Sequence, residues 1–514
     1  MNYKNIDFLH KVKQFKKNDS GVALILFTLM IVPILMVVAV AIDFGQTLVM
    51  KRQLAAAVDA AALSVAQLPG LTDKETTDKA ESYIRAHYPD TAIGILKTFS
   101  AVRSGDGAQV QVSATAEMNT TFLSFAGYDK LSVTVDSLAM MKQTKMEVVM
   151  VLDNTGSMGD YVGSTRKIDA LKSAANTLVD ILFGKDTESR YLKIGLVPFA
   201  NAVNIGAGFR GSTIMDETKP TALNTEQVLK ESGDGYSSLF QVFDKLGRTW
   251  GGCVRSRLDG YDLSDTAPSG GDRNTLFTPY FAPDEPDSGY ANNYLKDGSN
   301  TGKSKPYAFY RDNPEWSGSG AGPNYNCPSG VIQPLTNAKS TITTALGKMR
   351  AQGNTVIPEG LAWGWRVLSP GVPFTEGVAY DDPDTQKVII LLTDGRNDVS
   401  GGRNGNYKSV FTSYGYADNG HMGDTNGSNA ESTLNTKLST LCETIKADKD
   451  GDATDQDIMM YTIGFGITAG STIDTIMRGC ASEPEKYFNT PSAEELQSAF
   501  ENIALGLSKL RLAK

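Results

Sequence analysis

Five oxygen-bearing side chains follow apolar or turn-forming segments that lie far apart in the 514-residue chain. Asp153, Thr155 and Ser157 form one D-x-T-x-S group, and Thr355 and Asp394 come later. Carboxylate and hydroxyl oxygens are the ligands that Mg²⁺ prefers, and two carboxylates keep the total charge low enough for the ion to retain bound water. If the fold brings these residues together, they predict a site for Mg²⁺ or another divalent cation.

The two aspartates follow apolar runs that are typical of strands buried on both faces of a parallel sheet. The apolar runs are residues 148–152, 192–197, 388–392 and 458–463, and a helical pattern covers residues 168–183. Strands that alternate with helices predict an α/β fold with an open, doubly wound, mostly parallel sheet. In such sheets the functional site lies beyond the carboxyl ends of the strands, where Asp153 and Asp394 both fall.

The pattern D-x-[ST]-x-S, then Thr, then Asp resembles the metal-ion-dependent adhesion site of von Willebrand factor A (vWA) domains, which are Rossmann-like. Thr155 stands where that family usually has Ser, and the hydroxyl is retained. The resemblance implies that Thr155, Ser157 and Thr355 bind the cation directly, and that Asp153 and Asp394 complete its shell, often through water. It also implies an open coordination position that accepts a carboxylate from a partner protein.

Two enzyme interpretations compete with this one, and both are weaker. Residues 153–157 resemble the phosphorylated D-K-T-G-T of P-type ATPases, in which a HAD-like phosphotransfer enzyme would use Asp153 as its nucleophile. That pump needs several membrane spans, and this sequence predicts one. An aspartic protease needs D-T-G, which Asn154 interrupts. Because no nucleophile–base pair is recognisable, we expect no enzyme activity.

Residues 22–42 are 21 consecutive residues without a charged side chain, which is long enough to cross a bilayer as a helix. Five lysines precede this run, so we expect a single-pass inner-membrane protein with a cytoplasmic N-terminus and the bulk of the chain in the periplasm. A cleaved signal peptide is the less favoured alternative, because its apolar core is usually shorter. The Ala-rich residues 46–67 contain no Gly or Pro and predict that the helix continues beyond the membrane.

Segments outside the metal pattern resemble TadE/TadG-like proteins of the tight-adherence (Flp) pilus system. The segments are residues 21–23, 53–63, 363–370 and 496–512. The resemblance implies a pilus-assembly protein whose partners are other assembly proteins or pilin. The alternative is a surface adhesin that binds a host or matrix ligand. Prepilin processing expects Glu where Leu26 stands, so we expect the anchor to be retained.

The sequence therefore predicts four parts and two insertions. The parts are a basic cytoplasmic segment (1–20), a transmembrane helix that continues as an Ala-rich helix (21–69), a small α+β domain (70–142) and a vWA domain (143–514). Loop-rich insertions are expected at about 201–336 and 401–430. Tyr and Trp residues of the first insertion either form a partner surface or pack a small core, and the Gly- and Asn-rich second insertion is expected to be mobile.

The amino-acid composition argues against some classes of binding site. With 49 Lys+Arg against 58 Asp+Glu, the net charge is −9, and no long basic run provides a footprint for nucleic acid. Three histidines far apart make a His-rich zinc site improbable. Four cysteines suit two disulfides in an oxidising compartment. Of the three possible connectivities we favour the neighbouring pairs, Cys253–Cys327 and Cys442–Cys480.

Overall fold

The computed structural model divides into two units, residues 1–143 and 144–514, and each is described by itself. The described residues are 20–68, 71–89, 91–104, 109–140, 144–218, 236–285, 292–295, 322–400, 407–447 and 457–512. The basic segment predicted to be cytoplasmic lies outside these residues except for Ser20.

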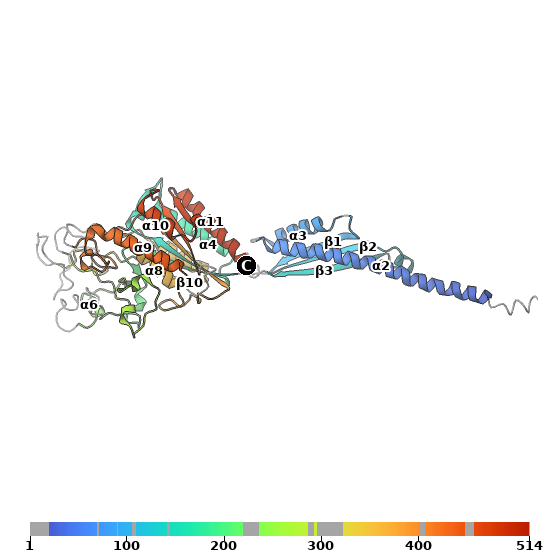
Figure 1. Ribbon diagram of the computed structural model, residues 1–514, viewed down its shortest axis with the longest axis horizontal. Coiled ribbons are helices and arrows are strands. Elements are labelled where there is room, and N and C mark those ends of the chain that lie inside the picture. The colour runs from blue at the N-terminus through green and yellow to red at the C-terminus, as the bar shows by residue number, and fades with distance from the viewer. Residues whose placement is uncertain are drawn as a thin grey trace, which may run out of the picture. The chain divides into compact units, whose positions relative to one another are not determined.

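The N-terminal unit begins with one helix of 47 residues, α2 (Ser20–Ala66) (Figure 1). It contains Pro33 but continues through the Ala-rich segment, which confirms the single helix predicted from residues 46–67. Within the described part of the chain, it is the one helix long and apolar enough to cross a membrane by length and composition. Its first half leaves large apolar side chains such as Phe27, Leu29 and Val37 exposed.

A three-stranded antiparallel sheet packs against the second half of α2. The further elements of this unit are α3 (Asp73–His87), β1 (Ile95–Arg103), β2 (Gln109–Asn119), the short 3₁₀ turn η1 (Leu123–Ala126) and β3 (Lys130–Met140). The sheet order is β1-β2-β3. Alternate residues of β2 from Val110 to Met118 are buried and form one core with Leu54, Val58 and Ala61 of α2. The period of two follows from the strand pleat, and it confirms the predicted strand.

The C-terminal unit is built on an eight-stranded sheet. Its strands are β4 (Lys145–Asp153), β7 (Leu192–Phe199), β8 (Val203–Asn204), β9 (Cys253–Val254), β10 (Gln333–Thr336), β11 (Thr385–Thr393), β12 (Ile458–Phe465) and β13 (Tyr487–Thr490). A separate small hairpin consists of β5 (Tyr161–Val162) and β6 (Thr165–Arg166). The order is β13-β12-β11-β4-β7-β8-β9, with β10 also paired to β7. The first five strands in this order are parallel, and the other three pair antiparallel.

Helices cover both faces of this sheet, because successive side chains of a buried strand point to opposite sides. Val148 and Met150 of β4 pack into a core with α4 (Lys167–Phe183), α7 (Lys339–Lys348) and α11 (Ala493–Leu512). Val149 and Val151 pack into a second core with α6 (Leu239–Lys245), α8 (Ile357–Leu368), α9 (Ala430–Lys446) and α10 (Thr472–Cys480). Figure 1 shows α11 beside α4.

Two glycines of helix α8 face the central strands and allow the helix to pack directly against them. A Cβ at Gly360 would overlap the side chain of Phe199, and one at Gly364 would overlap Val151. The amino end of α8 is thereby held next to the carboxyl ends of β4 and β7. This contact brings the Thr355 segment, which directly precedes α8, to the edge of the sheet where the aspartates lie.

Several aromatic residues are buried in the described parts of both insertions. In the first one Trp250 and Tyr294 are buried in the core between the sheet and α8, and Tyr280 is buried in a separate cluster, so these three residues form no partner surface. The second differs from the predicted mobile loop: Tyr407 and Phe411 are buried in a cluster with Tyr280. The physical reason is that aromatic side chains between the glycines bury enough area to order the segment.

Candidate metal centre

The first aspartate of the pattern lies at the end of β4 beneath the following loop. Asp153 is fully buried, and its Oδ1 accepts a hydrogen bond of 2.8 Å from the backbone N–H of Thr155. Its Oδ2 accepts 2.7 Å from the hydroxyl of Thr393 and 3.4 Å from the backbone N–H of Asp394. These bonds follow from the register, in which Leu152 of β4 pairs with Leu392 of β11. Asp153 therefore links two parallel strand ends.

A row of hydrogen bonds connects the first loop to the third. Thr155 Oγ1 and Ser157 Oγ are 3.1 Å apart, and Ser157 Oγ donates to Asp394 Oδ1 at 2.7 Å. Thr155 and Asp394 are buried, whereas Ser157 is exposed at the start of the short 3₁₀ turn η2 (Gly156–Gly159). Four of the five predicted residues thus form one cluster that solvent reaches at Ser157.

The fifth residue, Thr355, is brought to the same loops by backbone contacts. Its N–H and C=O both pair with the backbone of Asp398 at 3.0 Å. The backbone N–H of Gly156 donates to Gly353 O at 2.8 Å, which joins the Thr355 segment to the first loop. Within the described residues, no hydrogen bond connects the Thr355 hydroxyl to the other four side chains. The backbone contacts therefore fix the position of Thr355 beside the first loop.

Gly353 and Asn201 hold these loops against each other. Gly353 has φ +76°, which favours glycine, and a Cβ there would overlap Asn201 Oδ1. That amide oxygen accepts the backbone N–H of Asn354. The Asn201 amide donates to Phe411 O at 3.2 Å, and the packed second insertion is thereby tied to the site.

The electrostatic environment of the two carboxylates is uneven. Burial, together with the smaller effect of the nearby Asp394 charge, raises the pKa of Asp153 to about 7. Asp394 has a direct cationic partner, because Lys167 Nζ at the start of α4 lies 2.8 Å from its Oδ2. The Lys167 side chain is 17% exposed. Lys167 therefore balances the charge of Asp394, whereas burial disfavours the ionised form of Asp153.

The chemistry of this donor set fits Mg²⁺. In an octahedral shell at about 2.1 Å, adjacent oxygens lie about 3 Å apart. The two measured oxygen spacings of the row, 3.1 and 2.7 Å, are close to that value. Within the described residues, no group of three or more His, Cys, Asp or Glu side chains is placed to hold a metal. A cation at this site would consequently depend on hydroxyl oxygens as well as on the two carboxylates.

Two residues of the cluster were not predicted from the sequence. Thr393 directly precedes Asp394 but belongs to the strand, and its inward hydroxyl depends on the register with β4. Lys167 directly precedes the helix predicted from residue 168, where a lysine is usually a solvated side chain. Its ion pair with Asp394 spans 227 residues, and no local pattern indicates a contact across that separation.

Both disulfides lie outside this cluster. Cys253 pairs with Cys327 across the first insertion, and Cys442 of α9 pairs with Cys480 of α10. In the chain-entropy description each closed loop restricts the unfolded state and stabilises the folded unit by about 4 kcal/mol. The four cysteines of the chain are therefore all oxidised in this structure.

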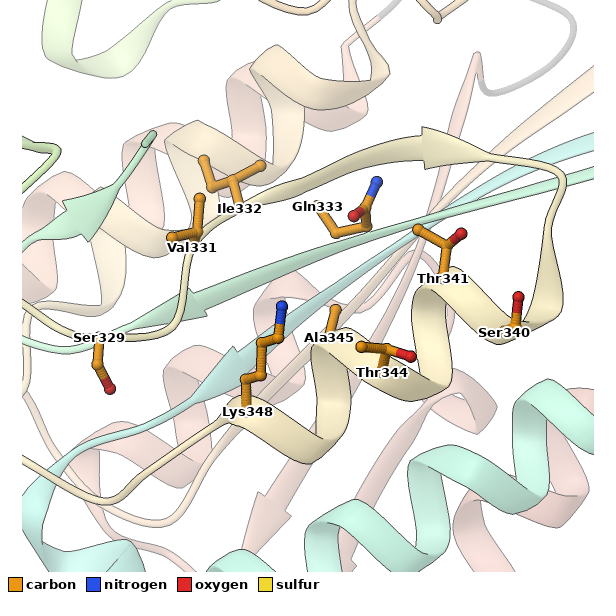
Figure 2. Close-up of a pocket in the computed structure, with 9 residues that line it drawn as sticks. All are labelled: Ser329, Val331, Ile332, Gln333, Ser340, Thr341, Thr344, Ala345 and Lys348. Carbon is orange, nitrogen blue, oxygen red and sulfur yellow. The ribbon is translucent and has the colours of Figure 1, made fainter. Parts of the chain in front are cut away.

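A separate groove lies between β10 and α7. Figure 2 shows Gln333 from β10 and Thr344 and Lys348 from α7 along this groove, together with the other lining residues. Its lining contains hydroxyl groups and one ammonium group but none of the five residues of the metal pattern. The groove is thus distinct from the candidate metal centre.

Comparison with known proteins gives one family match. Residues 21–68 match the family described as putative Flp pilus-assembly TadE/G-like. No curated protein sequence matches the chain. The N-terminal helix is therefore similar to a segment of pilus-assembly proteins, and its apolar character agrees with a membrane span or a signal anchor.

Several solved structures of pilus proteins are distantly similar. The pilus adhesin SpaC from Lactobacillus rhamnosus GG is 12% identical with TM-score 0.33; the match covers 82% of this chain and 35% of SpaC, about a third of its length. The vWF domain of the type V pili tip protein Mfa5 from Porphyromonas gingivalis is 9% identical with TM-score 0.32. This match covers 72% of this chain and 97% of the Mfa5 domain. The PilB minor pilin from Streptococcus sanguinis is 14% identical with TM-score 0.32, and the match covers 81% of this chain and 79% of PilB. TM-scores this low do not define a common fold, so the function is argued from this chain's own residues.

Proposed function

We propose that this chain is a membrane-anchored pilus-assembly protein whose C-terminal unit is a doubly wound vWA domain that binds partner proteins through Mg²⁺. One observation carries the proposal: Thr155, Ser157 and Asp394 form a continuous row of oxygens at the strand ends, with Asp153 buried beneath it. The family match of residues 21–68 supports the role in pilus assembly. No catalytic function is part of the proposal.

The hydroxyl and carboxylate residues of the site would have different roles in binding the cation. Thr155, Ser157 and Thr355 would hold the cation through hydroxyl oxygens, and Asp153 and Asp394 would supply the negative charge. A bound Mg²⁺ supplies a Lewis-acidic position for a carboxylate of the partner. Ser157 and the neighbouring Gly156 are exposed, so a side chain of another protein reaches this edge of the sheet without displacing a helix. Pilin and other pilus-assembly proteins are the proposed partners.

The proposed location is the inner membrane, with the N-terminus in the cytoplasm and the C-terminal unit in the periplasm. The apolar first half of α2 would form the single span over residues 22–42, and Asp43 would follow it on the periplasmic side. The two disulfides agree with an oxidising compartment. Because Leu26 replaces the Glu expected for prepilin processing, the span would be retained.

The metal site is tested by thermal unfolding of the full chain in detergent, with Mg²⁺ or with chelator. A ligand that binds only the native state at a hundredfold excess over Kd adds about 2.7 kcal/mol to the free energy of unfolding. Wild type should melt higher with Mg²⁺, and Asp394→Asn should lose this difference. Asp160→Asn is the matched control, because Asp160 is exposed on the same loop but outside the cluster. Equal stabilisation of wild type and Asp394→Asn would show that the site is wrongly placed.

The partner is tested by pull-down from membranes of the producing cell. Pilin or assembly proteins should be captured with Mg²⁺ and released by chelator. A surface adhesin with a host or matrix ligand remains the alternative, because it would use the same residues. Protease treatment of intact cells separates the two: a C-terminal unit that stays intact supports the periplasmic assembly role, and a unit that is digested supports the adhesin.

The structure provides an argument against phosphotransfer by Asp153. A carboxylate that forms an aspartyl-phosphate must reach its substrate with a free oxygen. Asp153 is fully buried beneath the following loop, so a substrate phosphate does not reach its oxygens. We therefore expect no phosphoryl transfer from labelled ATP to the protein in the presence of Mg²⁺, and labelling of Asp153 would reverse this assignment.

A further inference from the structure

The loop that connects β2 to β3 presents aromatic side chains to the outside. We call residues 120–128 the aromatic loop. Phe125 is 91% exposed, Tyr128 64% and Phe122 38%. No charged residue occurs between Glu117 and Asp129. Exposed aromatic residues of this size, gathered on an uncharged loop, are expected to have a partner.

The aromatic loop is fastened to α2 by one buried carboxylate. Asp43 Oδ1 accepts the backbone N–H of Thr121 at 3.0 Å, and Oδ2 accepts those of Phe122 and Leu123 at 2.9 and 2.7 Å. Three charge-assisted hydrogen bonds fix the loop at the height of Asp43 along the helix axis. Asp43 is itself buried although it lies on the long exposed helix.

The position of Asp43 along α2 indicates where the surface of a membrane would lie. It is the first charged residue after the uncharged run 22–42, and the next charged residue on the helix is Lys51. The boundary between hydrocarbon and water must therefore lie close to Asp43. Phe44 and Leu48 are exposed on the same stretch of α2. The loop and the helix thus present apolar side chains at one level.

We propose that the aromatic loop inserts into the periplasmic headgroup–acyl boundary of the phospholipid bilayer and forms a second membrane contact beside the span. Phe and Tyr rings bury their apolar bodies at this boundary, and the Tyr hydroxyl remains hydrated. Such side chains reach about 5–10 Å into the boundary. The inference rests on the proposed anchoring through residues 22–42 and goes beyond it, because a span alone requires no contact from the β2–β3 loop.

The opposite end of the same sheet provides a matched control. Val102 of β1 is 59% exposed and pairs with Gln111 of β2, eight residues before the end of that strand at Asn119. At about 3.4 Å per residue, it lies roughly 27 Å from the end of β2, where the aromatic loop follows. Val102 therefore resembles Phe125 in exposure and apolar character but should remain in water.

The experiment uses the full chain in phospholipid vesicles with single nitroxide labels. Phe125→Cys, Val102→Cys and Val37→Cys each introduce one free thiol, because the four native cysteines are paired. Collision rates of the label with O₂, which concentrates in lipid, and with a water-soluble nickel chelate report its environment. At Phe125 the ratio of O₂ to nickel collisions should be several-fold higher than at Val102. Phe125 is almost fully exposed, so its replacement removes no packing.

The third label separates the two proposals. Val37 is 69% exposed, lies within the run 22–42 and should report lipid. If Val37 reports lipid and Phe125 reports water, the loop contact is overturned and the anchor stands. If Val37 reports water, the proposed anchoring fails first. A Phe125 label that neither reagent reaches would show that protein, such as a second copy of this chain, covers the loop, and would also overturn the proposal.

Discussion

The ammonium nitrogen of Lys167 lies 2.8 Å from Oδ2 of Asp394, while Oδ1 of the same carboxylate accepts the hydrogen bond from Ser157. A positive charge of the protein therefore stands beside the carboxylate that the proposed divalent cation would use. The cation must either displace this ammonium group or bind in its field. Lys167 is thus expected to weaken cation binding and, without a cation, to relieve the repulsion between Asp394 and Asp153.

Replacement of Lys167 separates these two effects. Two unit charges about 5 Å apart interact by about 3 kcal/mol at an effective dielectric constant of 20, and movement of the side chain removes part of this energy. Lys167→Gln should therefore bind Mg²⁺ about tenfold more tightly by titration calorimetry, and in chelator it should be less stable by roughly 1 kcal/mol. Lys185→Gln, an exposed position beyond the other end of α4, is the control. An unchanged Kd would mean that Lys167 does not compete with the cation.

The raised pKa of Asp153 predicts how stability depends on pH without metal. Folding raises this pKa from 3.8 to about 7, so the folded state binds more protons than the unfolded chain between these values. The free energy of unfolding should consequently decrease as pH rises from about 4 to about 7, by a few kcal/mol at most. Urea unfolding in chelator at several pH values measures this slope. Asp153→Asn should reduce it, and an equal slope in both proteins would assign the effect to other groups.

Gly353 provides a test of how the loops are held together. Gly353→Ala introduces a left-handed residue and a Cβ that overlaps Asn201 Oδ1, so it should cost about 2–4 kcal/mol and weaken Mg²⁺ binding. Gly163→Ala is the matched control, because Gly163 also has positive φ, +62°, but nothing lies within 4 Å of its Cβ. It should cost roughly 1 kcal/mol and leave Mg²⁺ binding unchanged. Denaturant unfolding and calorimetry check both values, and similar losses in the two variants would contradict the role of Asn201.

Asp43 provides a test of the loop attachment that does not depend on lipid. Asp43→Asn keeps the size of the side chain but removes the negative charge and one acceptor oxygen. The amides of Phe122 and Leu123 should then exchange with deuterium faster in detergent, because their acceptor is weakened. Amides of β2 near Val112 should keep their protection. Unchanged exchange at Leu123 would show that the loop holds itself in place.

The strands were predictable where burial on both faces produces an uninterrupted apolar run, as at residues 148–152 and 388–392. The cluster at their ends was predictable in part, because carboxyl ends of neighbouring parallel strands meet at one edge. The contact of Lys167 with Asp394 was not predictable, since it depends on where α4 begins relative to β11. The backbone pair between Thr355 and Asp398 could not be predicted, because it does not depend on the types of their side chains. The packing of residues 407–430 could not be predicted either, because it depends on aromatic contacts with a segment more than a hundred residues earlier.

The proposed function would place this chain under tension, because a membrane would hold one end and a pilus component the other. Under load, a domain lengthens by the chain that it releases, about 3.5 Å for each residue. The disulfides span 74 and 38 residues, so they withhold roughly 260 and 130 Å of extension even if the surrounding structure opens. Both lie in the unit that carries the candidate metal centre. With both disulfides formed, this unit would therefore lengthen less under load than it would after their reduction.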